Sequence, residues 1–267
     1  MRILVCLFTI AFACLSEASA GETAWDAIRA DLFQDRQIID DGESVRIVAP
    51  KRAEDASIVP VTIYISGNLA ARATQLTLIV DENPAPVAAV FRFGDGYREG
   101  NVGDRIIETR IRLNDMSAVR AVLETGDEPA KVYAASQFVA GAGGCTSTSL
   151  KDMDEAMAAL GKTRLRVDRD ATRGPAWREA LLQVRHPNFS GMQIDTKTNT
   201  YLPAHFVERI DLDVAARPLV TIESGMSIAE NPSFRFSFAD FAGEPLKAVV
   251  RDTKGGLFSA RTERDLQ

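Results

Sequence analysis

The chain has 267 residues, a formal net charge of −6 and a hydrophobic content of 46%. The negative charge argues against nucleic acid or an anionic membrane as a general partner, and the hydrophobic content supports a real core in one large or two small domains. Only two histidines are present and aromatic residues make up 7%, which disfavours a metal-rich or carbohydrate-binding protein.

A secretory leader is predicted over residues 1–20. Arg2 supplies a positive start, residues 3–15 are almost wholly apolar, and Ala18-Ser19-Ala20 fits the small-residue cleavage pattern. The apolar stretch is too short to span a bilayer comfortably, and no later stretch is long and apolar enough to do so. We therefore expect an exported, periplasmic protein that begins at Gly21 and has no membrane span.

One helix is predicted at the start of the mature chain. Thr23 and Asp26 have the spacing of a capping box. Apolar side chains follow at helical spacing on one face, at Trp25, Ile28, Leu32 and Phe33. We expect this face to pack on the rest of the domain.

From Ser44 onward the period of the apolar residues changes to about two, which is typical of half-buried strands. Such strands are expected at residues 61–65, 76–80, 107–113 and 119–123. Turn clusters such as Gly94-Asp95-Gly96 separate them, which predicts an antiparallel sandwich or barrel. The strands do not alternate with long helices, which argues against a Rossmann-type fold.

The most informative segment is a glycine-rich run, residues 141–149, that contains Cys145. Of the three cysteines in the chain, Cys6 and Cys14 lie in the leader, so the mature protein keeps one thiol. A disulfide cysteine needs a partner, and a buried structural cysteine normally sits in an apolar strand or helix. We interpret Cys145 as a thiol presented to another molecule; the alternative is a plain linker with an incidental cysteine.

A short helix and a basic stretch follow the cysteine. Ser149 can cap a helix that ends at Gly161, with an apolar stripe formed by Leu150, Met153, Met157 and Leu160. The basic stretch contains Arg164, Arg166, Arg169, Arg173 and Arg178. It can attract anions, but its spacing supports no specific site, and a solvated strand and linker is the alternative.

A second β-rich segment is predicted from about residue 165 to the end. One strand is expected to place Phe206, Glu208, Ile210 and Leu212 on the face opposite Val207, and another alternates through Phe234, Phe236 and Phe238. Residues 252–256 read as a hairpin turn. Glu230-Asn231-Pro232 echoes Glu82-Asn83-Pro84, a hint of two similar sandwiches.

His186 and His205 are the candidate partners for a nucleophilic Cys145. A Cys-His pair needs contact in space, which a sequence does not show, and a lone histidine on a strand more often has a structural role. No carboxylate and histidine group has metal-ligand spacing, and the chain has neither a phosphate-binding loop nor a haem motif. We therefore assign no metal and no cofactor.

Two sets of motifs carry a family resemblance. The first consists of Leu78-Ile79-Val80-Asp81-Glu82-Asn83-Pro84-Ala85-Pro86, Thr109-Arg110-Ile111-Arg112-Leu113 and Gly143-Gly144-Cys145. It resembles SoxY, the sulfur-carrier subunit of the bacterial thiosulfate-oxidising (Sox) system. The second resembles SoxZ, its partner, and consists of Arg164-Leu165-Arg166-Val167, His186-Pro187, Pro203-Ala204-His205-Phe206 and Glu230-Asn231-Pro232. The chain therefore resembles the fused SoxYZ-like carriers, which are associated with quinoprotein dehydrogenase clusters.

The resemblance implies an all-β protein of two immunoglobulin-like β-sandwich domains, with a short N-terminal helix and a short linking helix. The expected organisation is a signal peptide at 1–20, a SoxY-like domain at 21–145, a linker with a short helix at 146–163 and a SoxZ-like domain at 164–267.

The resemblance also implies a role for the cysteine. Cys145 would be the covalent attachment point for a substrate intermediate, and Gly143 and Gly144 would form the carrier arm. Thr146 and Ser147 stand where the family has two further glycines, and the arm is tethered at both ends because a second domain follows it.

Three functions remain open from the sequence. The leading hypothesis is a non-catalytic periplasmic carrier that presents a covalent, sulfur-based intermediate to redox enzymes of sulfur oxidation. The second is an accessory or docking protein for a periplasmic quinoprotein (PQQ) alcohol dehydrogenase, with no covalent cargo. The third is a thiol enzyme that uses Cys145 with His205 as its thiol partner. For the carrier, we expect residues 141–149 to be exposed and poorly fixed, with sandwiches that pack together without them.

Overall fold

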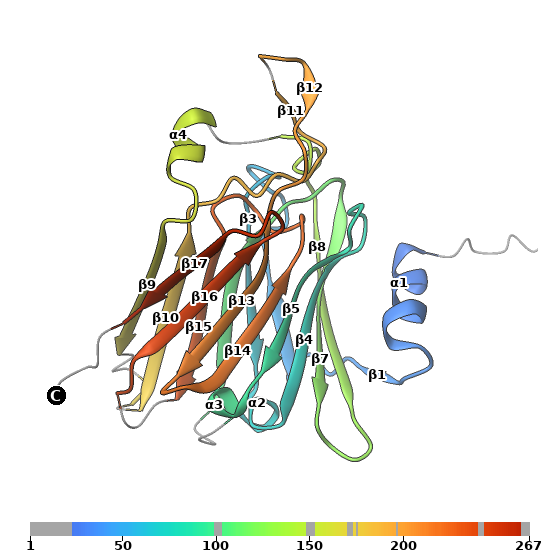
Figure 1. The fold of residues 1–267 in the computed structure, drawn as a ribbon. Coiled ribbons are helices and arrows are strands. Elements are labelled where there is room, and N and C mark those ends of the chain that lie inside the picture. The colour runs from blue at the N-terminus through green and yellow to red at the C-terminus, as the bar shows by residue number, and fades with distance from the viewer. Residues whose placement is uncertain are drawn as a thin grey trace, which may run out of the picture.

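Two β-sheets face each other across one hydrophobic core in the computed structural model (Figure 1). The structure describes residues 23–98, 103–147, 153–169, 173–174, 176–195, 197–239 and 243–262. The predicted leader lies outside these residues. Within them, no helix is long and apolar enough to cross a membrane.

The larger sheet has nine strands. Their spatial order is β1 (Ile38–Ile39), β8 (Val132–Val139), β7 (Ser117–Thr125), β4 (Ala73–Val80), β5 (Val87–Phe93), β14 (Arg217–Ser224), β13 (Val207–Val214), β16 (Leu246–Asp252) and β17 (Leu257–Arg261). Neighbouring strands pair antiparallel except β1 and β8, which pair in parallel.

The smaller sheet has six antiparallel strands. Their order is β2 (Val45–Val48), β3 (Val59–Ile65), β6 (Arg105–Ile111), β15 (Ser233–Ala239), β10 (Trp177–Val184) and β9 (Thr163–Arg169). The remaining elements are a hairpin of β11 (Ile194–Asp195) and β12 (Thr200–Tyr201), and helices α1 (Ala24–Phe33), α2 (Gly67–Ala70), α3 (Asp95–Arg98) and α4 (Met153–Ala158).

The alternating strands fold as their pattern predicts. In β3 the side chains of Val61, Ile63 and Ile65 are buried in the core between the sheets, because successive side chains of a strand point to opposite faces. The three phenylalanines of β15 are buried in the same way. The prediction of an all-β protein with two immunoglobulin-like sandwiches is confirmed.

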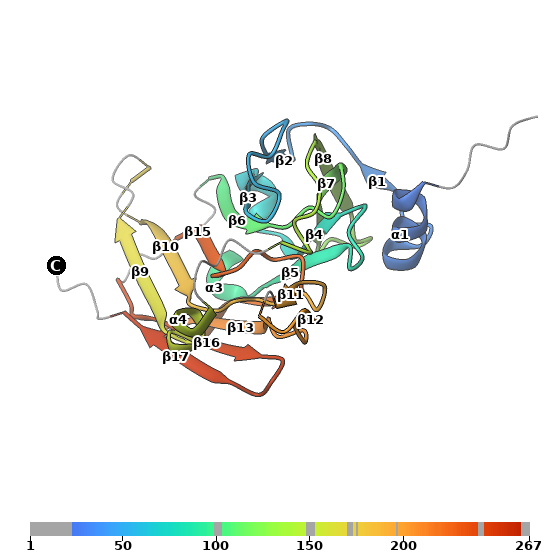
Figure 2. The same ribbon diagram turned by 90° about the horizontal axis from the view of Figure 1, so that it is seen from above.

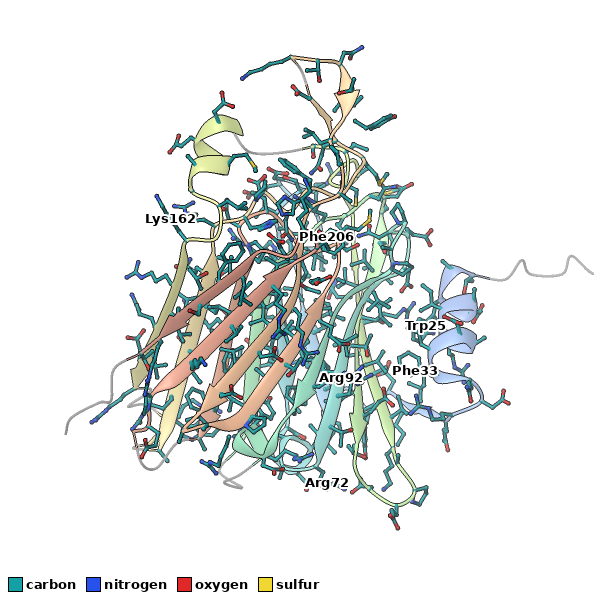
Figure 3. The ribbon with its side chains drawn as sticks, viewed as in Figure 1. Trp25, Phe33, Arg72, Arg92, Lys162 and Phe206 are labelled. Carbon is teal, nitrogen blue, oxygen red and sulfur yellow. The ribbon has the colours of Figure 1, made fainter. Side chains whose placement is uncertain are left out.

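Helix α1 covers the outer face of the larger sheet. Its capping box is present, with reciprocal hydrogen bonds between Thr23 and Asp26. Phe33 is buried against Ile79 of β4 in a small second core, which Trp25 also joins. Figure 3 shows Trp25 and Phe33 on the side of α1 that faces the sheet. This cover explains why Ile79, on the outward face of its strand, is fully buried.

The two halves of the chain share both sheets. In the larger sheet β5 pairs with β14 over five residue positions, and in the smaller sheet β6 pairs with β15. Figure 2 shows the N-terminal strands on one side of this joint and the C-terminal strands on the other. The sandwiches are therefore joined edge to edge into one continuous pair of sheets.

One local expectation needs correction. Val207, and not Phe206, is fully buried at the start of β13, because the pairing with β16 shifts register between Val207 and Arg209 and a bulge of this kind changes which face a side chain occupies. The linking helix is present as α4, and a turn follows it at residues 159–161. The proposed cap, Ser149, lies outside the described residues.

Candidate functional site

Cys145 follows β8, the last strand of the first half, in the segment that leads to the second half. Its side chain is buried, with 0% exposure, and it is a free thiol. The segment before it runs along residues 51–56: Ala53 donates a backbone hydrogen bond to Ala140, and Ala140 donates one to Lys51, each 2.9 Å long. The cysteine is thus part of a packed loop.

Two glycines shape this loop, for different reasons. The backbone N–H groups of Gly143 and Gly144 donate to the carbonyl oxygens of Asn114 (2.9 Å) and Leu113 (2.7 Å). Gly143 has a φ of +78°, which favours glycine. A Cβ at Gly144 would lie 2.0 Å from the carbonyl oxygen of Ala56. The close approach of two backbone segments therefore requires glycine at residue 144.

The second half of the chain holds the same loop from the other side. The hydroxyl of Ser190 donates to the carbonyl oxygen of Cys145 at 2.5 Å, and the amide Nε2 of Gln193 donates to the carbonyl oxygen of Ser147 at 3.2 Å. Gln193 is itself fixed, because its Oε1 accepts from the backbone N–H of Ser190 at 2.8 Å. The cysteine loop is therefore clamped between the two halves.

A buried arginine crosses the joint beside the thiol. Arg112, just after β6, has 0% exposure. Its Nη1 donates to the backbone carbonyl oxygens of Asn188 (2.7 Å), Ile228 (2.8 Å) and Met226 (3.3 Å). All three belong to the second half, so this one side chain ties the halves together. Strand alternation predicts an outward-facing Arg112, and no residue pattern near it indicates that the chain turns its side chain inward.

The electrostatics at the cysteine are set by burial and by this arginine. Burial raises the pKa of the Cys145 thiol, and the positive charge of Arg112 partly opposes the rise. Burial likewise lowers the pKa of Arg112, against the negative charges of Glu230 and of an ionised Cys145. The docked cysteine is therefore a neutral thiol beside a buried cation.

The expectation of an exposed, poorly fixed arm is wrong for Gly144 and Cys145, which are both buried. Ala142, Thr146 and Ser147 are exposed, as expected. The physical reason is the glycine itself, which permits the close backbone approach that docks the segment. Residues 148 and 149 lie outside the described part of the chain.

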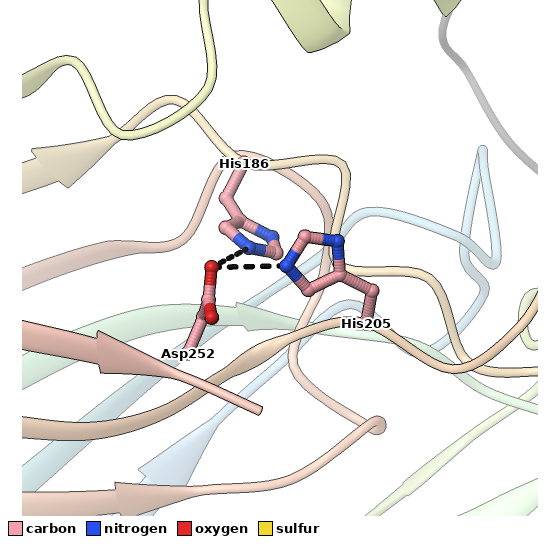
Figure 4. A group of neighbouring side chains, drawn as sticks. All are labelled: His186, His205 and Asp252. Carbon is pink, nitrogen blue, oxygen red and sulfur yellow. Dashed lines mark hydrogen bonds and ion pairs between the residues drawn. The ribbon is translucent and has the colours of Figure 1, made fainter. Parts of the chain in front are cut away.

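The two histidines meet around a buried carboxylate (Figure 4). The rings of His186 and His205 lie 4.6 Å apart between centroids in an edge-on arrangement. Oδ2 of Asp252 lies 2.9 Å from Nε2 of His205 and 3.5 Å from Nε2 of His186. Oδ1 of the same carboxylate accepts from the backbone N–H groups of Lys254 and Gly256. The predicted hairpin turn thus supplies a buried acid that the sequence did not mark as one.

The hydrogen bonds of this cluster fit a structural role better than a metal site. The backbone N–H of Asn188 donates to Nδ1 of His186 at 3.0 Å, so the proton of the neutral ring lies on Nε2. That proton faces Asp252. The three ligand atoms lie within 4.8 Å of one another. A metal ion at Nε2 of His186 would need the lone pair that the N–H bond already uses, so this tautomer does not bind a metal there.

His205 is engaged away from the cysteine. Its Nε2 bonds Asp252, its Nδ1 has no hydrogen-bond partner, and within the described residues no hydrogen bond joins it to Cys145. The link between the two is indirect, because Phe189 pairs with His205 and the neighbouring Ser190 bonds the cysteine backbone. The role of His205 as a thiol partner stays a prediction.

Two family models match the chain in tandem. The model "Sulfur oxidation protein SoxY" matches residues 29–145, and "Sulphur oxidation protein SoxZ" matches residues 167–263. The first match ends on Cys145. No curated protein matches the chain.

Solved structures show weaker likeness. The sulfur carrier protein SoxY from Chlorobium limicola f thiosulfatophilum is 24% identical, with 44% of this chain and 91% of that chain covered and a TM-score of 0.35. A marsupial T cell receptor is 10% identical, with 82% of this chain and 95% of that chain covered and a TM-score of 0.24.

Joined immunoglobulin-like sandwiches with tandem SoxY and SoxZ matches define the class, which is the family of sulfur-oxidation carriers. Within this class the chain belongs to the fused SoxYZ-like proteins, with the SoxY domain first and the SoxZ domain second.

Proposed function

We propose that this protein is a non-catalytic periplasmic carrier that holds a sulfur intermediate covalently on Cys145 and presents it to redox enzymes of sulfur oxidation. The observation that carries the proposal is that the SoxY match ends on Cys145, which is the one cysteine outside the predicted leader. Gly143 and Gly144 then form the carrier arm. The predicted leader supports export, and without it Cys145 has no other cysteine to pair with in the mature chain.

The attachment chemistry needs a partner enzyme. Coupling a thiol R–SH with thiosulfate gives R–S–S–SO₃⁻ and releases one proton and two electrons. A partner redox protein must accept those electrons, because the sulfur–sulfur bond forms by oxidation of both sulfur atoms. Such an adduct keeps a negative charge, and Arg112 is a cation within electrostatic reach of Cys145. This charge favours an anionic cargo over a neutral one.

Transfer requires the docked loop to open. Four hydrogen bonds hold residues 143–147: two from glycine N–H groups, one from Ser190 and one from Gln193. At roughly 0.5–1.5 kcal/mol each, these bonds place the open state about 2–6 kcal/mol above the docked state. Local openings of this size are ordinary in native proteins. The docked state shields the thiol, and the rarer open state exposes it to a partner.

The proposal is tested by replacing the chromosomal gene with a Cys145→Ser variant. We expect the variant to accumulate to the normal level and to lose sulfur-oxidation activity in whole cells completely. An exposed change in the same loop, Thr146→Ser, is the matched control and should keep full activity. Full activity of Cys145→Ser would overturn the carrier proposal.

Burial of Cys145 favours a second candidate, an accessory or docking protein for a periplasmic quinoprotein alcohol dehydrogenase. In that case the cysteine fills space at the joint and no cargo is attached. The protein would co-purify with the dehydrogenase, and the association would survive Cys145→Ala. Loss of function in that variant with the association intact would reject this candidate.

A further inference from the structure

A cavity of about 410 Å³ opens on the outer face of the six-stranded sheet. It lies where β9 begins and β10 ends, and Arg110 of β6, a strand of the first half on the far side of β15, completes its lining. Figure 3 shows Lys162 at this end of β9, below α4. Four of the residues that line the cavity are cationic, and none is acidic; the cations are Arg110, Lys162, Arg164 and Arg185.

The strand register places these cations side by side. Arg164 of β9 is directly opposite Gln183 of β10. Beyond the end of β10, the backbone N–H of Arg185 donates to the carbonyl oxygen of Lys162 at 2.9 Å, which extends the ladder by one pair. The side chains of Lys162 and Arg185 are exposed. Lys162 and Arg185 are therefore like charges directly opposite each other, an arrangement that destabilises a sheet. A negatively charged group beside them would relieve this repulsion.

Acidic side chains do not supply that counter-charge. Within the described part of the chain, Lys162, Arg164 and Arg185 form no ion pair. By contrast, Arg166 on the same face of the same strand pairs with Asp168 at 2.5 Å. The chain as a whole is acidic, with a net charge of −6. The unpaired cations around this cavity therefore do not reflect a general excess of positive charge on the protein.

Arg110 adds an unsatisfied donor. Its Nη2 donates to the carbonyl oxygen of Asn231 at 2.6 Å, which fixes the guanidinium. Its Nε is buried and has no hydrogen-bond partner. A buried donor without an acceptor costs free energy, and Glu230, its acidic neighbour, acts on Arg110 through charge. An acceptor oxygen brought by a ligand would satisfy this group.

We propose that this cavity binds a small oxyanion with two negative charges, of the sulfate type. Guanidinium groups offer pairs of donors that match oxyanion geometry, and the lysine adds a mobile charge. The site does not depend on covalent chemistry at Cys145, so it stands or falls separately from the carrier proposal.

The test is calorimetric titration of the full mature chain with sodium sulfate, at an ionic strength held constant with sodium chloride. We expect saturable binding of one sulfate per chain. Arg164→Gln should weaken it about tenfold or more, the loss expected for roughly one charge-assisted hydrogen bond. Arg166→Gln is the matched control on the same strand and should leave the affinity within about twofold.

The proposal would be overturned if sulfate showed no saturable binding. Equal weakening by Arg164→Gln and Arg166→Gln would mean general charge attraction and would also overturn it. So would tighter binding of malonate than of sulfate, which would mean a dicarboxylate site. Arg110→Gln serves as a second variant, and its thermal melt shows whether it folds. Folded protein with unchanged sulfate affinity would also contradict the proposal.

Discussion

At the residue scale, His186 makes the stability of the protein depend on pH. Burial, and then the neighbouring His205, lower the pKa of His186 from 6.5 to about 4. The unfolded chain therefore binds this proton more tightly than the folded one. The stability it contributes is fully present above pH 6.5 and is lost as the pH falls toward about 4.

Between pH 6.5 and about 4, we expect protonation of His186 to lower the free energy of unfolding by up to about 1.4 kcal/mol for each pH unit of acidification. His186→Gln, which keeps a polar side chain but does not titrate, should flatten the dependence. Urea denaturation at pH 7, 6, 5 and 4 measures both. Parallel pH profiles for the two proteins would show that His186 is not the titrating group.

The sequence identified Cys145 but not the residues that control it. Arg112 belongs to a motif of alternating residues that predicts an outward side chain. Because β6 ends at Ile111, the alternation stops there, and the side chain of Arg112 points into the joint between the halves. Ser190 and Gln193 are more than forty positions from the cysteine in the chain. Contacts of this kind depend on how the halves meet, and no local pattern of residue types encodes that.

At the scale of elements, the cysteine loop can dock only because Gly144 has no side chain between it and the backbone of Ala56. Gly144→Ala would place a Cβ 2.0 Å from the carbonyl oxygen of Ala56, and backbone at that distance cannot yield without moving the loop. We expect the loop to undock and Cys145 to react with a disulfide reagent at least about tenfold faster, since docking suppresses exposure by more than about 1.4 kcal/mol.

The measurement is the rate of thiol modification under native conditions, with the melting temperature recorded in parallel. Ala142→Ser, at an exposed position of the same loop, is the control and should react like the wild type. If Gly144→Ala also reacted at the wild-type rate, the loop would not be what protects the thiol.

Elements were predictable where one face of a strand or helix is buried by its own half. The capping box of α1, the alternation of β3 and the phenylalanines of β15 all follow from residue type and spacing. The start of β13 did not, because a bulge shifts its pattern. The docked glycine loop did not either, because the same glycines permit both a flexible arm and a tight backbone contact.

At the scale of the whole molecule, the shared sheets predict cooperative unfolding. Phe91 of β5 and Phe234 of β15 come from different halves and meet in an edge-on contact, with ring centroids 6.1 Å apart. Removing one ring therefore weakens both halves together. We expect one calorimetric transition, and Phe91→Ala should lower its free energy of unfolding by about 3–5 kcal/mol without splitting it.

Differential scanning calorimetry measures the number of transitions and their enthalpy. Phe138→Ala is the control, since that ring is exposed, and it should leave the transition within about 0.5 kcal/mol of the wild type. Two separate transitions, with only one of them moved by Phe91→Ala, would mean that the halves fold independently in spite of their shared strands.

The central claim is that Cys145 carries a covalent sulfur cargo. The most direct measurement is the intact mass of the protein, purified from the periplasm of sulfur-oxidising cells without reductant. We expect a heavier species that a thiol reductant converts to the unmodified mass and that is absent from the Cys145→Ser variant. An unmodified mass under all growth conditions, or an adduct that persists in Cys145→Ser, would contradict it.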